Sequence, residues 1–413
     1  MKSSSSKHRV TIIGLNYAPE PTGIAPYTTR LAELLASQGH AVQIVTGYPH
    51  YPAWKLAKGY SGWQCHETRN GVAVTRLRHF IPSNHSNFNR MHMELSFGLR
   101  LLFARWNTPD VVLLVSPSLF ASAFGLFRAR LGISRPATGV WVQDIYTRGL
   151  AETGSGNSIQ TRLMKLFEGL VFRSAVKVTV IHDRFRDYLV SELGVRSENV
   201  GVIRNWTHLK PVEALDRSAT RQTLGWGDET VVLHAGNIGV KQALENVVLA
   251  AQKADDVSAK VKFVLLGSGN QREKIQELAM GVERIEFLAP VSDEEFNAVL
   301  HAADILLVNE MPGLREMAVP SKLTSYFSTG LPVLAATEFN STTATEIASS
   351  GAGLRISPGR PAELLEAVIN LAADSELAEK LGQAGKNYAK NVLSEEAAII
   401  QYSAWLRELA TAK

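Results

Sequence analysis

Cysteine and long apolar runs are what this 413-residue sequence lacks most clearly. Cys65 is the only cysteine, so the chain can form neither an intramolecular disulfide nor a zinc site built from several thiolates. The longest apolar stretch, residues 111–127, is interrupted by Pro117 and three serines and is too short to span a bilayer. Residues 1–9 are polar and rich in serine, unlike a secretory signal peptide. We therefore expect a cytoplasmic protein without a membrane span.

Charge is unevenly distributed, although the net charge of the whole chain is only +4. Residues 1–206 carry 24 lysines and arginines against 12 aspartates and glutamates, whereas residues 207–413 carry 19 against 27. The basic half has no dense cationic run and no nucleic-acid-binding motif, so we do not expect nucleic acid as a partner. Long-range electrostatic attraction depends on the overall positive charge and requires no binding motif. An anionic membrane surface or a phosphate-bearing acceptor therefore fits this half better.

Both halves repeat a strand–helix–strand pattern that is typical of parallel sheets with right-handed crossovers. The first half is expected to form strands at residues 10–13, 41–46, 111–115, 139–142 and 177–181, with a helix at residues 25–38. The second half is expected to form strands at residues 230–234, 262–266, 285–288, 304–308 and 333–335, with helices at residues 246–253, 271–280 and 293–302. Continuous apolar runs of this kind indicate strands that are buried on both faces.

The pattern predicts two α/β domains, residues 1–206 and residues 207–393. Residues 394–413 follow as one helix, with apolar side chains at helical spacing. Open α/β sheets bind ligands at the carboxyl ends of their strands, so a site in a cleft between the domains is expected.

Residues 236–242, Gly-Asn-Ile-Gly-Val-Lys-Gln, follow the first strand of the second domain and open a helix in this prediction. The glycines, Gly236 among them, let backbone amides approach a phosphate, and a helix N-terminus supplies partial positive charge. Lys241 would add a full charge where a diphosphate leaving group becomes negative. An ordinary strand-to-helix turn with an exposed lysine explains the same pattern equally well.

Two other glycine-containing turns are candidates for the same site. Residues 14–23 end at Gly23 and could cradle phosphates from the first domain, and Gly267 begins a Gly-Ser-Gly turn after a strand. The first loop lacks the G-x-G-x-x-G spacing of a dinucleotide fold, and no acidic residue ends the second strand. A nicotinamide-dependent oxidoreductase is therefore disfavoured.

The segment from Leu314 to Val333 is the most specific stretch of the chain. A polar loop with Pro-Ser-Lys at residues 320–322 enters a short helix, which ends at Gly330 and leads through Leu-Pro-Val into a strand. This segment resembles the nucleotide-sugar signature of glycosyltransferase family 4.

The variant with Pro-Ser-Lys resembles the capsule, O-antigen and colanic-acid-type bacterial transferases of that family. Residues 16–23, residues 39–40 and the glycine-asparagine-x-glycine of residues 236–239 match the same subgroup. The resemblance therefore extends, in the right order, over nearly the whole chain.

The resemblance implies the GT-B fold, an α/β architecture with two Rossmann-like domains whose parallel sheets face each other across a cleft. It implies an N-terminal acceptor-binding domain, a C-terminal domain that binds a nucleotide sugar, and a final helix, residues 394–413, that packs back on the N-terminal domain. It also implies transfer with retention of anomeric configuration, without a metal or other cofactor. On this basis the expected donor-binding residues are Gly23, Gly236, Asn237, Lys241, Gly267, Glu316, Ser321 and Lys322.

The sequence departs from the family pattern at two places. The family has two glutamates separated by seven residues, whereas here Ser325 stands at the second position and Glu316 lies one residue from the first. An arginine that often precedes the phosphate-binding lysine is also missing, with Asn237 in its region. Recognition of the ribose and sugar hydroxyls is then expected from Glu316, Ser321 and Lys322.

Asp144 ends the first-domain segment Val-Trp-Val-Gln-Asp. The family carries an acidic residue or histidine here, close to the acceptor, so Asp144 and Lys241 are the expected catalytic residues. An aspartate that caps the next helix is the competing interpretation.

Residues 95–106 and 119–131 combine leucine and phenylalanine with arginines. Core-facing amphipathic helices explain each stretch alone, but together with the basic first half they favour docking on the inner face of an anionic membrane. A glycan or lipid-linked acceptor would be presented there.

Two further alternatives remain open. A non-hydrolysing nucleotide-sugar epimerase shares the GT-B fold, but it would need paired carboxylates and a histidine in the cleft. A catalytically inactive GT-B scaffold subunit is compatible with Ser325 in place of the second glutamate. A measurement of nucleoside diphosphate release from a nucleotide sugar distinguishes these hypotheses.

Overall fold

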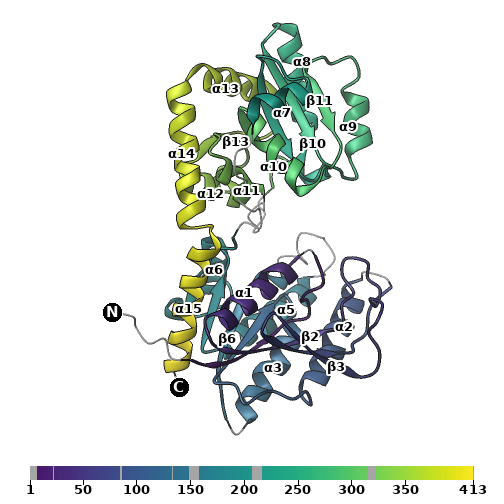
Figure 1. Cartoon of the computed structure of the whole chain (residues 1–413), viewed down its shortest axis with the longest axis vertical. Helices are drawn as coiled ribbons and strands as arrows, with labels where there is room; N and C mark the ends of the chain where they lie inside the picture. Colours follow the sequence, from purple (N-terminus) through teal and green to yellow (C-terminus); the bar gives the residue numbers. More distant parts are fainter. Residues whose placement is uncertain are drawn as a thin grey trace. The chain divides into compact units, whose positions relative to one another are not determined.

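A computed structural model describes residues 7–21, 23–83, 86–132, 134–147, 158–206, 216–314 and 322–412. The chain forms two compact units (Figure 1). The N-terminal unit comprises Met1–Asn205 together with Ala398–Lys413, and the C-terminal unit comprises Trp206–Ala397.

The N-terminal unit contains an eight-stranded sheet in the order β3-β4-β2-β1-β5-β6-β7-β8. Its strands are β1 (Arg9–Ile13), β2 (Ala41–Gly47), β3 (Gln64–Arg69), β4 (Val72–Leu77), β5 (Val111–Ser116), β6 (Ala137–Val142), β7 (Lys177–Val180) and β8 (Val200–Val202). Its helices are α1 (Ala25–Ser37), α2 (Asn87–Leu101), α3 (Leu119–Leu131), α5 (Ser158–Ser174), α6 (Asp183–Ser191) and most of α15 (Glu395–Thr411). All neighbouring strands are parallel except β3 and β4.

The antiparallel hairpin of β3 and β4 was not expected from the sequence. Its turn is formed by Asn70 and Gly71, whose φ angles of 47° and 80° are those of a two-residue hairpin turn. The side chains of β3 are almost all exposed, so the strand lacks the apolar signature of its neighbours. The Asn-Gly pair was the signal that could have revealed it.

The helix α15 completes the core of the N-terminal unit. The ring of Tyr402 lies 5.1 Å from that of Trp141 on β6, and both side chains are buried. A Cβ at Gly139 would lie 2.7 Å from Trp405, so only glycine lets this helix approach the strand. The hydroxyl of Ser403 donates to Gln38 just beyond α1, at 2.9 Å.

The C-terminal unit contains a six-stranded parallel sheet in the order β11-β10-β9-β12-β13-β14. Its strands are β9 (Thr230–Ala235), β10 (Val261–Leu266), β11 (Ile285–Leu288), β12 (Ile305–Asn309), β13 (Val333–Ala336) and β14 (Gly353–Ile356). Its helices are α7 (Arg217–Leu224), α8 (Glu245–Asp256), α9 (Arg272–Leu278), α10 (Asp293–Ala302), α11 (Lys322–Thr329), α12 (Thr342–Ser350), α13 (Pro361–Ala373) and α14 (Ser375–Asn391). Two apolar clusters, built on the two faces of the central strands, form its core.

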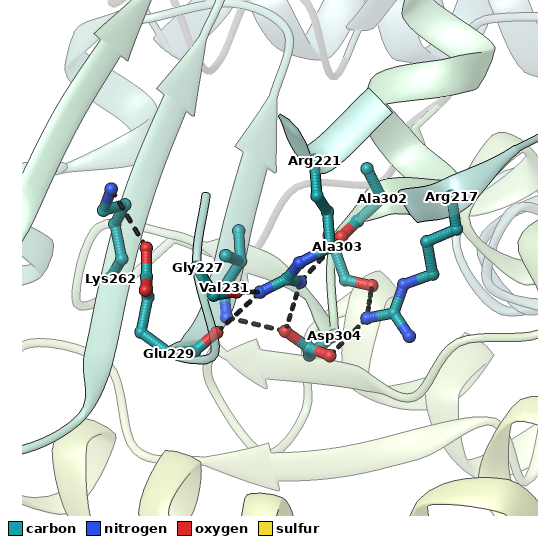
Figure 2. A network of polar contacts seen from close by, with 9 residues as sticks. All are labelled: Arg217, Arg221, Gly227, Glu229, Val231, Lys262, Ala302, Ala303 and Asp304. Atoms are coloured by element: carbon teal, nitrogen blue, oxygen red, sulfur yellow. Dashed lines mark hydrogen bonds and ion pairs between the residues drawn. The ribbon is translucent and has the colours of Figure 1, made fainter. Parts of the chain in front are cut away.

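A charged network holds α7 to the amino ends of β9 and β12 (Figure 2). The carboxylate of Asp304 accepts from the amide of Val231 at 2.8 Å and from Arg221 at 3.0 Å, and it also pairs with Arg217. Arg221 in addition donates to the backbone oxygens of Gly227, Glu229 and Ala302. This network lies at the edge of the sheet opposite to the loops described below.

The strands predicted from the sequence are all present, with ends shifted by at most two residues. Two helix predictions need correction. The segment 236–242 does not open an α-helix directly, because a short 3-10 helix, η2 (Val240–Gln242), precedes α8. The helix expected at residues 95–106 begins earlier, at Asn87, where Ser86 accepts from the amide of Asn89, and it ends at Leu101.

Candidate functional site

The loops that follow β9 and β10 lie against each other at the carboxyl edge of the C-terminal sheet. The amide of Gly236 donates to Leu266 at 2.8 Å, and the amide of Ile238 donates to Ser268 at 2.8 Å. A Cβ at Gly267 would overlap the carbonyl oxygen of Gly236, so this residue must be glycine. Gly236 and Gly267 are thus brought together, and they shape a backbone surface at the position where α/β sheets bind ligands.

Side chains within the loop fix its conformation. The amide side chain of Asn237 donates to Gln242 at 3.1 Å, and the backbone amide of Gly239 donates to the same oxygen at 3.1 Å. Lys241 lies in η2 with its side chain exposed, and its carbonyl accepts from the amide of Met311 at 2.9 Å. The loop therefore presents Lys241 to solvent from a backbone that is held on both sides.

Lys322 begins α11 and contacts the same loop. Its Nζ lies 3.2 Å from Nε2 of His234 on β9, and a Cβ at Gly236 would lie 3.8 Å from that Nζ. Burial lowers the pKa of Lys322 to about 7, although the carboxylate of Glu310 acts in the opposite direction. Burial and the neighbouring lysine hold the pKa of His234 well below its ordinary value, so this ring is neutral. A lysine whose protonation state changes near neutral pH therefore lies beside the glycine loop.

Asn309, the last residue of β12, and Glu310, which follows it, complete this edge and were not anticipated. Asn309 donates to the carbonyl oxygens of Gln242 at 2.8 Å and Ala243 at 3.0 Å, so it anchors the end of the loop. The carboxylate of Glu310 is buried and accepts from the hydroxyls of Thr337 and Thr343. Two polar residues at the carboxyl end of a buried apolar run were the sequence signal for their place at the site.

Two of the expected donor-binding residues, Glu316 and Ser321, lie outside the described residues. Gly23, another expected donor-binding residue, and Asp144, an expected catalytic residue, belong to the N-terminal unit. Of the predicted site residues, Gly236, Asn237, Lys241, Gly267 and Lys322 belong to the loops and the helix start described above.

Gly23 lies in a loop that Glu20 ties to the loop after β2. The buried carboxylate of Glu20 accepts from the amides of His50 at 2.8 Å and Tyr51 at 2.9 Å, and from the side chain of Asn16 at 2.8 Å. Gly23 has φ of 68°, which favours glycine, and it leads into α1 beside Tyr51. Glu20, whose carboxylate organises both loops, was not predicted as a site residue from the sequence.

Asp144 follows β6 and is exposed; its carboxylate accepts from the amide of Ile145 at 2.8 Å. The next two amides, of Tyr146 and Thr147, donate instead to the buried Glu168 at 2.7 and 3.2 Å. The helix-capping interpretation of Asp144 is therefore weakened, because Glu168 satisfies the amides that a capping aspartate would bind.

Comparison with known proteins adds a family to this geometry. Residues 22–206 match the Glycosyl transferase 4-like domain, and residues 229–374 match Glycosyl transferases group 1. The putative colanic acid biosynthesis glycosyl transferase WcaI of Escherichia coli K12 is 31% identical over 338 residues, covering 78% of this chain and 81% of that protein. The chain belongs to glycosyltransferase family 4.

Solved structures of such enzymes share the fold of this family member. Sucrose-phosphate synthase from Thermosynechococcus elongatus matches with a TM-score of 0.71 at 16% identity, over 98% of this chain and 100% of that one. Anabaena HepE in complex with UDP matches with a TM-score of 0.69 at 16% identity, over 97% and 100%. The two α/β units thus share the GT-B fold. The family membership, not the fold, disfavours the oxidoreductase and epimerase alternatives.

Proposed function

We propose that this glycosyltransferase moves a sugar from a nucleotide diphosphate donor to a growing bacterial surface polysaccharide, with retention of anomeric configuration and without a metal ion. The observation that carries the proposal is the glycine loop after β9 with Lys241 on it and Lys322 beside it. The similarity to a colanic acid transferase supports the polysaccharide as product, and the complexes of Anabaena HepE with UDP and UDP-glucose support a nucleotide sugar as donor.

The leaving nucleoside diphosphate requires positive charge when no cation is used. Lys241 and Lys322 supply it in this proposal, and the absence of a side chain at Gly236 keeps the loop backbone close to the Nζ of Lys322. Asn237, Glu316 and Ser321 are assigned to the donor as well. The sequence contains no Asp-x-Asp pair of the kind that would bridge a cation to the diphosphate.

The acceptor is assigned to the N-terminal unit. Asp144 lies at the carboxyl end of β6, which is where a doubly wound sheet binds its ligand. Gly23, in the loop after β1, remains assigned to the donor. The basic composition of residues 1–206 supports a lipid-linked acceptor at the cytoplasmic face of an anionic membrane. None of the helices within the described residues is long and apolar enough to cross a membrane.

Turnover of a donor panel tests the proposed function. The protein is incubated with UDP-, GDP-, dTDP- and ADP-sugars and with lipid extract as acceptor source, and nucleoside diphosphate release is followed. We expect release with one base and stereochemical retention in the product, measured by NMR. No release with any donor would favour the inactive scaffold, and inversion would contradict the assigned stereochemistry.

The metal-free assignment has its own test. Activity should persist in excess chelator, because the lysines supply the charge that a cation would otherwise provide. Loss of activity with chelator, and its recovery on addition of Mg²⁺ or Mn²⁺, would contradict this assignment.

A further inference from the structure

The helices α2, α3 and α5 form one continuous layer in the N-terminal unit, with α3 between the other two. Arg128 of α3 donates to the carbonyl oxygen of Leu101 at the end of α2, and Arg130 donates to that of Ser174 at the end of α5. The rings of Phe120 and Phe167 stack between α3 and α5 at 5.1 Å. These contacts make the outer side of the three helices a single surface.

That surface carries large apolar side chains that face solvent. On α5 they recur at helical spacing as Ile159, Leu163, Leu166 and Leu170, each between 58% and 68% exposed. The opposite side of α5 packs inward through Glu168, Val171 and Phe172. The other members are Phe88, Leu99, Phe103, Phe127 and Leu131. A stripe at this spacing, exposed on a helix whose other face is packed, indicates a surface that something apolar covers.

The charges of these helices have one sign wherever they face solvent. The three helices contain two acidic residues, Glu94 and Glu168, and both are buried. Glu94 accepts from the amide of Phe120 at 3.0 Å and Glu168 from that of Tyr146 at 2.7 Å, so both carboxylates are turned inward to helix starts. The cationic residues of the three helices are Arg90, Arg100, Arg128, Arg130, Arg162, Lys165 and Arg173. Lys165 is paired with the carboxylate of Glu192, just beyond α6, at 2.6 Å, so the positive charge of this surface comes from its arginines. The surface is therefore apolar and cationic at once.

We propose that the outer surface of α2, α3 and α5 is the part of the protein that rests on an anionic phospholipid bilayer, with the α5 stripe inserted between head groups. Apolar side chains flanked by arginines fit the boundary between acyl chains and anionic head groups. Pairing with a second copy fits less well, because a twofold contact would bring cations together with no exposed acid on these helices to meet them. The inference rests on the proposed lipid-linked acceptor and assigns it a surface.

Vesicle flotation tests the proposal on the full-length protein. Vesicles are made of phosphatidylcholine alone or mixed with phosphatidylglycerol, at low and at high salt. The wild-type protein should float with the anionic vesicles at low salt and be released as salt rises, because screening shortens the range of the attraction to about 3 Å at 1 M.

Two variant pairs locate the contact. Leu163→Glu with Leu166→Glu should weaken flotation by about tenfold or more, because it places anions in the stripe. Leu249→Glu with Val257→Glu is the matched control, since these apolar side chains are exposed at α8 of the C-terminal unit. Arg162→Gln should weaken binding to anionic vesicles only.

A failure of the membrane proposal can be distinguished from a failure of the proposed function. Both pairs should keep the wild-type unfolding temperature and the wild-type rate of nucleoside diphosphate release in detergent. Equal flotation of the α5 and α8 variant pairs would overturn the proposal. Flotation that does not depend on the phosphatidylglycerol content of the vesicles would also overturn it. So would a dimer, detected by light scattering, that the α5 pair alone dissociates. Loss of diphosphate release in detergent by the wild type would instead contradict the proposed function.

Discussion

Lys241 is the residue on which the donor chemistry of this glycosyltransferase depends most in our proposal. Lys241→Ala should leave a folded protein whose turnover falls by about a hundredfold or more, as for other groups that stabilise charge in a transition state. Lys253→Ala, which removes an exposed lysine from α8, is the control and should retain full turnover. Steady-state kinetics with the active donor measures both, and near-normal turnover of Lys241→Ala would remove this lysine from the mechanism.

The partly buried Lys322 predicts a pH dependence of donor binding. With a pKa of about 7, it is mostly neutral above pH 7 in the empty site, and a bound diphosphate would stabilise its charged form. Binding then takes up a proton, so donor affinity should fall as pH rises above 7, by up to about tenfold per pH unit. Calorimetry with the active nucleotide sugar, in buffers of different ionisation enthalpy, measures both the affinity and the proton.

Glu310 allows the origin of that pH dependence to be tested. Its carboxylate raises the pKa of Lys322, so Glu310→Gln should move the decline in donor affinity to lower pH while the amide keeps its contact with Thr337. Glu346→Gln changes another buried carboxylate of the C-terminal unit, which accepts from Tyr388 at 2.7 Å, and should leave the profile in place. An unchanged profile in Glu310→Gln would show that Lys322 is not the titrating group.

The elements that carry the site depend on the charged network at the far edge of the sheet. Asp304→Ala removes the acceptor for two arginines and for the amide of Val231 (Figure 2), so the C-terminal unit should lose about 2 kcal/mol of stability. Asp228→Asn, an exposed change near the same strand, should have almost no effect. Urea unfolding, monitored through hydrogen exchange of the backbone amides in β9 and β12, measures the stability of this unit separately from the other. Equal stability of Asp304→Ala and Asp228→Asn would contradict the role assigned to Asp304.

At the scale of elements, the repeated strand–helix pattern could be predicted from the sequence, whereas the hairpin of β3 and β4 was missed. Ten buried parallel strands were predicted from their apolar runs, with ends within two residues, whereas the parallel strands β4, β8 and β14 were not predicted. The hairpin strand β3 has exposed, polar side chains, so only its Asn-Gly turn marked it.

The candidate site likewise contains residues that the sequence identifies and residues that it does not. Gly236, Lys241 and Gly267 follow strands and could be read from the chain, and these assignments to the donor remain predictions. His234 and Asn309 act through contacts with residues at least 60 positions away, and Glu310 through contacts with Thr337 and Thr343, which are 27 and 33 positions away. No local pattern predicts such contacts. Glu168 likewise serves helix starts from a distant place in the chain.

At the scale of the whole molecule, the chain leaves the N-terminal unit after Asn205 and re-enters it at Ala398. The side chains of Tyr402, Trp405 and Leu409 are buried in that unit, against Gly139 and Trp141 on β6. Removing residues 398–413 should therefore destabilise the N-terminal unit, which contributes none of the proposed diphosphate-binding lysines. Thermal unfolding with domain-resolved hydrogen exchange should show lost protection in β6 and retained protection in β9.

This return also sets an order of events during synthesis. A ribosome that has completed Asn205 has synthesised every strand of the first sheet, but the helix that covers β6 is still nearly two hundred codons away. Until then the apolar surface at Gly139 and Trp141, which Tyr402 and Trp405 later cover, stays exposed on the nascent chain. The whole second unit is synthesised in the meantime, so the unit that begins first is completed last.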